Sequence, residues 1–247
     1  MKRMVDKSKN IGDYIKKNED AIINNKISVA EIAKKFGVTK QLIYYYANHV
    51  SKGLFQRREE QLDIYLKQIY RDIKEGIPLD VIMKQTYAQP FLTQRGKENI
   101  HRAKDLIVNR LKSREIIPND EQVNVLVNAK LKNYVNLLQI EQVLIEKSDI
   151  NKAQLGREIG VSYHKMLIIN QNIKRAPFRE LPNIPQELYD ILKRNIEIAS
   201  DFFVFGDRKS VYNKYEDINN HVLRLVIDGY KPFINKKLII NRDTDND

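Results

Sequence analysis

The sequence predicts a mainly α-helical, multi-helical protein. Two units built from short helix pairs are joined by helical segments and followed by a small C-terminal helical or α+β region. Only 9 of the 247 residues are glycine and 7 are proline, so few positions interrupt a helix. Alternation of valine and isoleucine at period two, which is typical of strands, is scarce. Hydrophobic residues make up 42% of the chain, which is enough for a packed core.

The N-terminal half is expected to contain a basic arm followed by helices. The arm over 1–10 could lie along DNA or be a solvated terminus. Apolar residues at helical spacing predict a first helix over 11–24, and two short helices follow it. The Tyr/Ile/Leu stripe over 60–74 predicts a long helix, which we place in the core rather than in a dimer seam. Residues 77–111 predict two helices around a proline, forming a spacer rather than a third helix pair.

The C-terminal half is expected to begin with a long helix over 123–145. Three prolines mark a linker over 177–185, and a helix over 186–196 opens the last domain. Residues 202–205 are aromatic and β-branched and predict a short strand. The tail over 242–247 is expected to fray. These elements define four domains: a first helix-pair domain over 1–56, a helical middle segment over 57–118, a second helix-pair domain over 119–176 and a C-terminal domain over 177–247.

Composition narrows the class of protein. The formal net charge of +11 attracts polyanions, with nucleic acid first and an anionic membrane surface second. The absence of cysteine excludes disulfides and thiolate metal sites and fits a reducing cytoplasm. No stretch approaches the roughly 18 apolar residues of a membrane span, and residues 1–15 lack the apolar run of a secretory signal. We therefore expect a cytoplasmic protein that does not enter membranes.

Residues 26–50 carry the first helix pair. Ser28 and Glu31 predict a capping box, in which the serine hydroxyl and the glutamate carboxylate each accept a backbone N–H at the start of the helix. Gly37 ends this helix, because glycine takes the left-handed backbone of a sharp turn without strain. Thr39 caps the next helix. The positions expected to turn inward are Ile32, Ala33, Phe36, Val38, Ile43 and Tyr46.

This order of small, apolar, glycine, apolar and capping residues resembles the helix-turn-helix of bacterial repressors, resolvases and transposase DNA-binding domains. The resemblance covers residues 26–50, about a tenth of the chain. It implies that the second helix enters the major groove of DNA. Glutamine and asparagine can pair with adenine edges, lysine with guanine or phosphate, and tyrosine with phosphate. The residues expected to contact DNA are Thr39, Lys40, Gln41, Tyr44, Tyr45 and Asn48.

The same pattern recurs 123 residues later, within 150–173, where Gly160 corresponds to Gly37. A second capping box is expected at Asn151 and Gln154. Two such patterns in one basic chain favour a repeated unit over a chance match. The other equivalent positions are Ile27 and Ile150, Ala30 and Ala153, Ile32 and Leu155, Phe36 and Ile159, Val38 and Val161, Thr39 and Ser162, Ile43 and Met166, and Tyr46 and Ile169.

The second pair has a less polar outward side. By the same resemblance, the residues expected to contact DNA are Ser162, Tyr163, His164, Lys165 and Gln171. Leu167 and Ile168 lie among them and are poor groove residues, although they can touch thymine methyl groups. They would equally suit a protein partner or a buried contact between domains, so these alternatives remain open.

No motif of catalysis or cofactor binding is found in the sequence. The four histidines lack metal-ligand spacing, and neither a glycine-rich phosphate loop nor a nucleophile elbow occurs. The segment His221–Arg224, which follows Phe203–Gly206, resembles the H-x-L-R box of tyrosine recombinases. No upstream arginine box accompanies it, and Tyr230 lies too close to serve as that family's nucleophile, so we interpret the segment as ordinary helix packing. We expect no enzymatic activity, no cofactor and no metal.

The function expected from these features is sequence-specific binding of double-stranded DNA, as a transcriptional regulator (a repressor) of a mobile element, plasmid or phage. Two alternatives remain: a replication, partition or recombination accessory protein, and a helical protein-interaction module without DNA binding. Double-stranded DNA is the expected partner. A homodimer and a protein partner for the C-terminal domain remain open.

Overall fold

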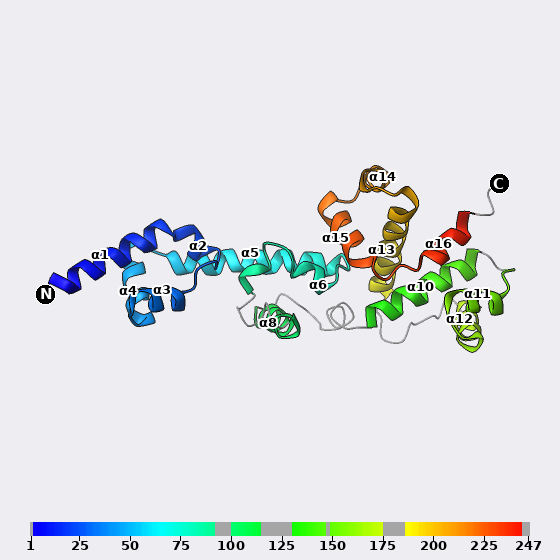
Figure 1. The fold of residues 1–247 in the computed structure, drawn as a ribbon, viewed down its shortest axis with the longest axis horizontal. Helices are drawn as coiled ribbons and strands as arrows, with labels where there is room; N and C mark the ends of the chain where they lie inside the picture. The colour runs from blue at the N-terminus through cyan, green and yellow to red at the C-terminus, as the bar shows by residue number, and fades with distance from the viewer. Residues whose placement is uncertain (1, 92–99, 115–129, 147–148, 175–185, 244–247) are drawn as a thin grey trace. The chain divides into compact units, whose positions relative to one another are not determined.

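The computed structural model is helical, and no strand occurs in the residues that it describes. This confirms the predicted mainly α class. The chain divides into two compact units, of which the first contains residues 1–69 and 85–116 and the second residues 70–84 and 117–247. The described residues, drawn as coloured ribbon in Figure 1, are 2–91, 100–114, 130–146, 149–174 and 186–243.

The first unit begins with a longer helix than the sequence predicted. The loose arm expected over 1–10 is wrong, because helix begins at Lys2 and no glycine or proline between 2 and 10 stops it. The helix expected over 11–24 is interrupted at Asn18, whose side-chain amide donates to the Tyr14 carbonyl oxygen at 2.8 Å. The helices of this unit are α1 (Lys2–Lys17), α2 (Glu19–Ile23), α3 (Val29–Phe36), α4 (Lys40–Val50), most of α5 (Leu54–Lys74), the 3-10 helix η1 (Gln89–Phe91) and α8 (Ile100–Ser113).

Three of these helices share one core. Ile15 of α1, Ile32 of α3 and Ile43 of α4 are each at most 1% exposed. The ring of Tyr14 packs edge-to-face on Phe36, with 5.4 Å between centroids. Because α1 packs against α4 and α4 against α3, the two short helices are held as a rigid pair.

The helix expected over 60–74 begins earlier, at Leu54, because the charged residues before position 60 are good helix formers. Its apolar stripe is buried, with Leu62, Leu66 and Ile69 at most 2% exposed. Packing of this stripe in the core, rather than in a dimer seam, is therefore confirmed.

Two more departures from the sequence prediction concern residues 202–205 of the second unit and residues 77–111, of which 85–111 belong to the first unit. The strand expected over 202–205 is wrong, since these residues end a helix that no glycine or proline interrupts before Gly206. The described residues of 77–111 form two helical turns, Leu79–Ile82 and Gln89–Phe91, and α8, rather than two helices around Pro90. The predicted linker over 177–185 lies outside the described residues. The helices of the second unit are the end of α5, α6 (Leu79–Ile82), α10 (Lys130–Glu146), α11 (Lys152–Ile159), α12 (Tyr163–Lys174), α13 (Gln186–Phe205), α14 (Arg208–Lys214), α15 (Asn220–Tyr230) and α16 (Lys236–Asp243).

Two hydrogen bonds and an ion pair join distant segments of the second unit. Tyr230 of α15 is fully buried and donates its phenolic proton to the Gly76 carbonyl oxygen at 2.6 Å. Asn195 of α13 donates to the Glu75 carbonyl oxygen at 2.8 Å, and Arg194 forms an ion pair with the Glu75 carboxylate at 2.8 Å. The turn after α5 is thereby fixed against α13 and α15.

Candidate nucleic-acid interface

The first helix pair begins with the predicted capping box. The hydroxyl of Ser28 accepts the Glu31 backbone N–H at 3.2 Å, and the Glu31 carboxylate accepts the Ser28 backbone N–H at 2.7 Å. Two hydrogen bonds with Ser28 lower the pKa of Glu31 below its ordinary value. The larger effect comes from the Ser28 backbone N–H and the smaller from the Ser28 side chain. Two N–H groups that the helix itself leaves unpaired are thus satisfied.

The turn between α3 and α4 has the expected left-handed glycine. Gly37 adopts φ +62° and ψ +41°, and the Val38 N–H donates to the Ala33 carbonyl oxygen at 3.0 Å. Thr39 then caps α4, because its hydroxyl accepts the Leu42 N–H at 3.3 Å. This bond uses the Thr39 hydroxyl locally and fixes the direction in which α4 leaves the turn.

α4 has one buried side and one exposed side. Ile43 and Ala47 are fully buried against α1 and α3. Five of the residues that the sequence predicted as DNA contacts lie on the other side: Lys40, Gln41, Tyr44, Tyr45 and Asn48 are all exposed. The helix therefore offers one cationic side chain and four hydrogen-bonding side chains to a partner.

The two tyrosines of this surface are exposed but supported. Tyr44 is 43% exposed, and its ring lies 4.6 Å from the ring of Phe55. Tyr45 is 55% exposed and lies 4.2 Å from the ring of His49, whose Nδ1 is 2.9 Å from the Tyr45 carbonyl oxygen. Because neighbouring rings restrict them, both tyrosines lose less conformational entropy on binding than free side chains would.

The charge of the chain is concentrated in this unit. The first unit contains 21 lysines and arginines against 11 aspartates and glutamates, a formal net charge of +10. The second contains 22 against 21, a net charge of +1. Lys34 and Lys35 of α3 and Lys52 after α4 are exposed, and the Lys35 ammonium lies 3.9 Å from the centre of the Tyr14 ring. The net charge of the whole chain does not show that the first unit holds most of it.

The second helix pair has the same left-handed glycine turn as the first. It has only one of the two interactions of a capping box, the one in which the cap side chain accepts backbone N–H groups. Asn151 accepts the backbone N–H groups of Ala153 and Gln154 at 3.0 and 3.1 Å. The return bond predicted for Gln154 is wrong, because its amide donates instead to the Glu158 carboxylate one turn further along, at 3.0 Å. Gly160 adopts φ +72° and ψ +29°, which matches the turn of the first pair.

The outward side of α12 differs from that of α4. Tyr163 is 53% exposed and Ile168 44% exposed, while Leu167 is half-buried. Ser162 caps α12 by accepting the Lys165 N–H at 3.3 Å. The predicted contacts His164, Lys165 and Gln171 are all exposed.

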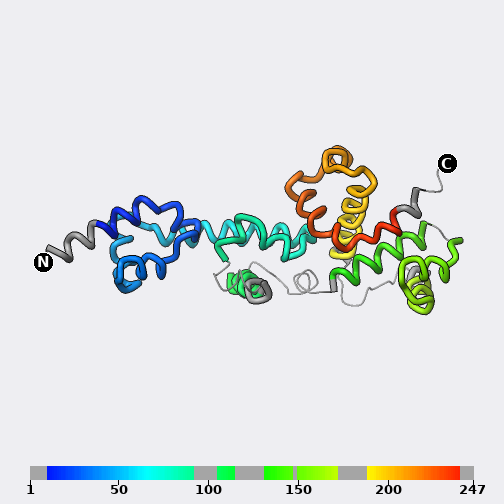
Figure 2. Tube along the Cα trace, in the orientation of Figure 1, coloured from blue at the N-terminus to red at the C-terminus, as the bar shows by residue number. Residues whose placement is uncertain are grey.

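A feature that sequence analysis missed completes this second pair. Leu238 of α16 belongs to the same core as Leu155 of α11 and Met166 of α12. Lys237 also donates to the Glu158 carbonyl oxygen at the end of α11, at 3.0 Å. Figure 2 shows α16 running alongside α10. No spacing in the sequence links positions so far apart, so this support was found only in the structure.

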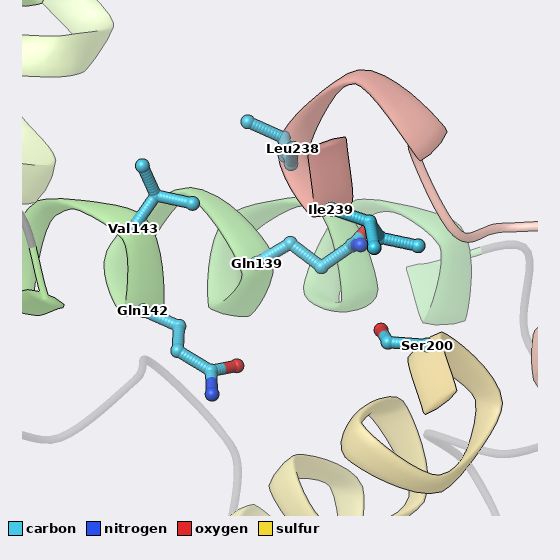
Figure 3. A pocket seen from close by; sticks show the side chains of 6 residues that line it. All are labelled: Gln139, Gln142, Val143, Ser200, Leu238 and Ile239. Carbon is cyan, nitrogen blue, oxygen red and sulfur yellow. The ribbon is translucent and has the colours of Figure 1, made fainter. Parts of the chain in front are cut away.

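A narrow crevice lies between α10, α13 and α16 (Figure 3). Two of its polar side chains form internal hydrogen bonds: the Ser200 hydroxyl donates to the Ile196 carbonyl oxygen at 2.7 Å, and the Gln139 side-chain oxygen accepts the Asn235 N–H at 3.0 Å. The crevice leaves no room for a water molecule. Its lining residues are Gln139, Gln142, Val143, Ser200, Leu238 and Ile239.

The segment that resembles a recombinase box lies in α15, and its tyrosine is structural. Burial raises the pKa of the Tyr230 phenol, which is fully enclosed and bonded to Gly76. His221 Nε2 lies 4.0 Å from the buried carboxylate of Asp72. No group of three histidine or carboxylate side chains in the described ranges could hold a metal ion.

The geometry defines a class of protein: an all-α chain with two glycine-turned helix pairs, one of which exposes a polar, aromatic helix on a strongly basic unit. Comparison with known proteins finds no match, because no protein-family model, curated protein or solved structure aligns with this chain. Within the described part of the chain, no helix is both long and apolar enough to cross a membrane.

Proposed function

We propose that this protein binds double-stranded DNA in a sequence-specific manner and acts as a transcriptional regulator, a repressor, of a mobile element, plasmid or phage. One observation carries the proposal: α4 is anchored by a fully buried side and exposes Lys40, Gln41, Tyr44, Tyr45 and Asn48 on the other. An α-helix of this kind fits the major groove of B-form DNA. Such a role implies a cytoplasmic location.

Affinity and specificity would come from different groups. Lysines and arginines of the first unit, including Lys40, would contact phosphates and provide most of the binding free energy. Gln41 and Asn48 can each make paired hydrogen bonds to adenine, which phosphate contacts cannot replace. Tyr44 and Tyr45 would fix the position of the helix on the sugar-phosphate backbone. The same surface would serve a replication, partition or recombination accessory protein.

The exposed side of α12 is less suited than that of α4 to contacting bases in the major groove. Its unit has a net charge of +1, and Ile168 offers a base edge only apolar contact. The predicted contacts of Tyr163, His164, Lys165 and Gln171 with a second groove segment, about one helical turn (~34 Å) from the first, are not part of this proposal. The proposal therefore depends on α4 and not on α12.

The phosphate contacts are tested by titrating salt against binding to random duplex DNA. The logarithm of the binding constant should fall linearly with the logarithm of the salt concentration, by about 0.9 for each phosphate contacted. Lys40→Ala should reduce that slope by about one contact, while Lys165→Ala, an exposed lysine of α12, should leave it unchanged. Binding that does not respond to salt would favour a protein-interaction module instead.

The base contacts are tested by selecting bound sequences from a random DNA pool. Gln41→Ala and Asn48→Ala should each relax the preferred sequence at one or two positions, at a cost of about 1–3 kcal/mol against the best site. Gln171→Ala changes the position of α12 that matches Asn48 and should leave the preferred sequence unchanged. If both α4 variants select the same sequences as the wild-type protein, α4 does not read the bases.

A further inference from the structure

The exposed side of α4 has two amides along its middle and a tyrosine on each side of them. Gln41 and Asn48 are seven residues apart, which is close to two full turns, so they lie within about 20° of one another around the helix axis. Tyr44 lies about 60° to one side of Gln41, and Tyr45 lies about 40° to the other side. We refer to Gln41 and Asn48 as the amide pair.

The two tyrosine rings pack against residues outside the amide pair. Tyr45 contacts His49 and Tyr46, with 4.2 and 5.6 Å between ring centroids, and both of these residues lie further around the helix from the amides. Tyr44 contacts Phe55, which belongs to α5, with 4.6 Å between ring centroids. Each ring is therefore held by a neighbour of its own and does not depend on the amides for support.

The amide pair is available to a ligand. Both residues are exposed, and no hydrogen bond within the described part of the chain uses the side chain of Gln41 or Asn48. Asn18 and Asn24 of the same unit, by contrast, donate their side-chain amides to backbone carbonyl oxygens at 2.8 Å. A free amide offers a donor and an acceptor, which match the N7 acceptor and the amino donor of adenine in the major groove.

The groups that commonly read guanine and cytosine are absent from the middle of this surface. Arginine is the usual reader of guanine and a carboxylate that of cytosine, and α4 contains no arginine, aspartate or glutamate. Lys40 can also contact guanine, but it lies about 100° around the helix from Gln41, at the edge of the exposed side, where it suits a phosphate contact. The middle of the surface therefore favours A·T base pairs.

We propose that α4 reads two A·T base pairs about three steps apart, one through Gln41 and the other through Asn48. This inference rests on the proposed function and adds to it the class of target sequence. Seven residues of helix are about 10.5 Å long, and base pairs are stacked about 3.4 Å apart. A helix that lies along the major groove thus places the two amides about three base-pair steps apart, each against the N7 and amino group of an adenine.

The test uses the duplex that the full-length wild-type protein selects from a random pool, with one adenine at a time, on either strand, replaced by 7-deazaadenine. This base still pairs with thymine but has a C–H group where adenine has the N7 acceptor. At two positions about three steps apart, the replacement should weaken wild-type binding about twofold to tenfold, through loss of one hydrogen bond. Gln41→Ala should not respond at one of these positions and Asn48→Ala should not respond at the other, while each variant keeps the loss at the remaining position.

Gln171→Ala, the matched change on α12, should respond like the wild-type protein at both positions. Sensitive positions that are adjacent, or more than about four steps apart, overturn the proposal. It is also overturned if G·C pairs occupy the positions that Gln41→Ala and Asn48→Ala relax. Salt-dependent binding to duplex DNA would, in these cases, still support the proposed function. A chain that binds no duplex DNA contradicts the proposed function, and this inference with it.

Discussion

Three glycines in the helix pairs are required for two different reasons. Gly37 and Gly160 adopt left-handed backbone conformations, and no atom lies within 4 Å of where a Cβ would stand. Gly156 has ordinary helical geometry, but a Cβ there would lie 2.6 Å from the Val161 carbonyl oxygen. At Gly37 and Gly160, any residue with a side chain would have to adopt an unfavourable left-handed backbone conformation. At Gly156, a side chain would instead clash with the turn after α11 and displace it.

We expect Gly156→Ala to lower the free energy of unfolding by about 1–3 kcal/mol, because a backbone oxygen must move to admit the methyl group. Gly160→Ala should cost about 1–2 kcal/mol through its left-handed backbone. Urea unfolding followed by circular dichroism measures both changes. A Gly156→Ala variant as stable as the wild-type protein would show that the turn after α11 yields easily.

Tyr230→Phe tests the hydrogen bond that joins α15 to the turn after α5. Removing the hydroxyl leaves the buried Gly76 carbonyl oxygen without this donor, which should cost about 1–3 kcal/mol of unfolding free energy. Tyr45→Phe removes the hydroxyl of an exposed tyrosine and serves as the control. Equal stability of the two variants would mean that another donor reaches Gly76.

Sequence analysis could predict some of these residues and not others. Gly37 and Gly160 follow from the helix pattern itself, because a helix that ends in a sharp turn favours glycine at one defined position. Gly156 corresponds to Ala33, where the first pair accommodates a methyl group, so nothing in the pattern shows that glycine is needed. The hydrogen bond of Tyr230 joins positions 154 residues apart and could not be inferred from spacing.

At the level of single helices, the capping box of α3 should make stability depend on pH. The pKa of Glu31 is lower in the folded protein than its ordinary value of 4.5. A carboxylate of this kind stabilises the fold fully above its unfolded pKa, and the stabilisation is lost as pH falls through the lower folded pKa. The difference in unfolding free energy between the wild-type protein and Glu31→Gln should therefore shrink below about pH 4.5. Parallel pH profiles for the two proteins would contradict this expectation.

The presence of a helix was easier to predict than the residues at which it begins and ends. The short helices on each side of Gly37 were correct, because their caps and glycine turn are local signals. The strand expected over 202–205 was wrong, since the aromatic and β-branched residues there continue a helix that begins at Gln186. Gln154 occupies the position of Glu31, but a carboxylate one turn away competes for its amide. Competition of this kind depends on the neighbouring turn and is not visible in a four-residue motif.

At the scale of the whole molecule, α16 should control the stability of the second helix pair. Leu238→Ala removes a side chain that is 2% exposed and should cost about 2–5 kcal/mol. Hydrogen exchange should become faster in α11 and α12 and remain unchanged in α3 and α4. Leu238→Met, which nearly preserves volume, should cost less than about 1.5 kcal/mol. Unchanged exchange in α11 would show that the second pair does not need α16.

The largest gap in the sequence prediction concerned the distribution of charge. Net charge and the repeated helix pattern suggested two DNA contacts, of which the second had the less polar outward side. The structure assigns the stretches of chain to units, and this assignment concentrates the positive charge in the unit that contains α4. Each unit is formed from two separate stretches of the sequence. Counting charges along the sequence therefore could not give the net charge of each unit.

The position of Leu238 also has a consequence for protein synthesis. The core around α1, α3 and α4 is closed by residues between 11 and 54, so it can form soon after that segment leaves the ribosome. The core of α11 and α12 is complete only with Leu238, which the ribosome adds 72 residues after Met166. A nascent chain would therefore carry a finished first helix pair while the apolar residues of the second were still uncovered and open to chaperones.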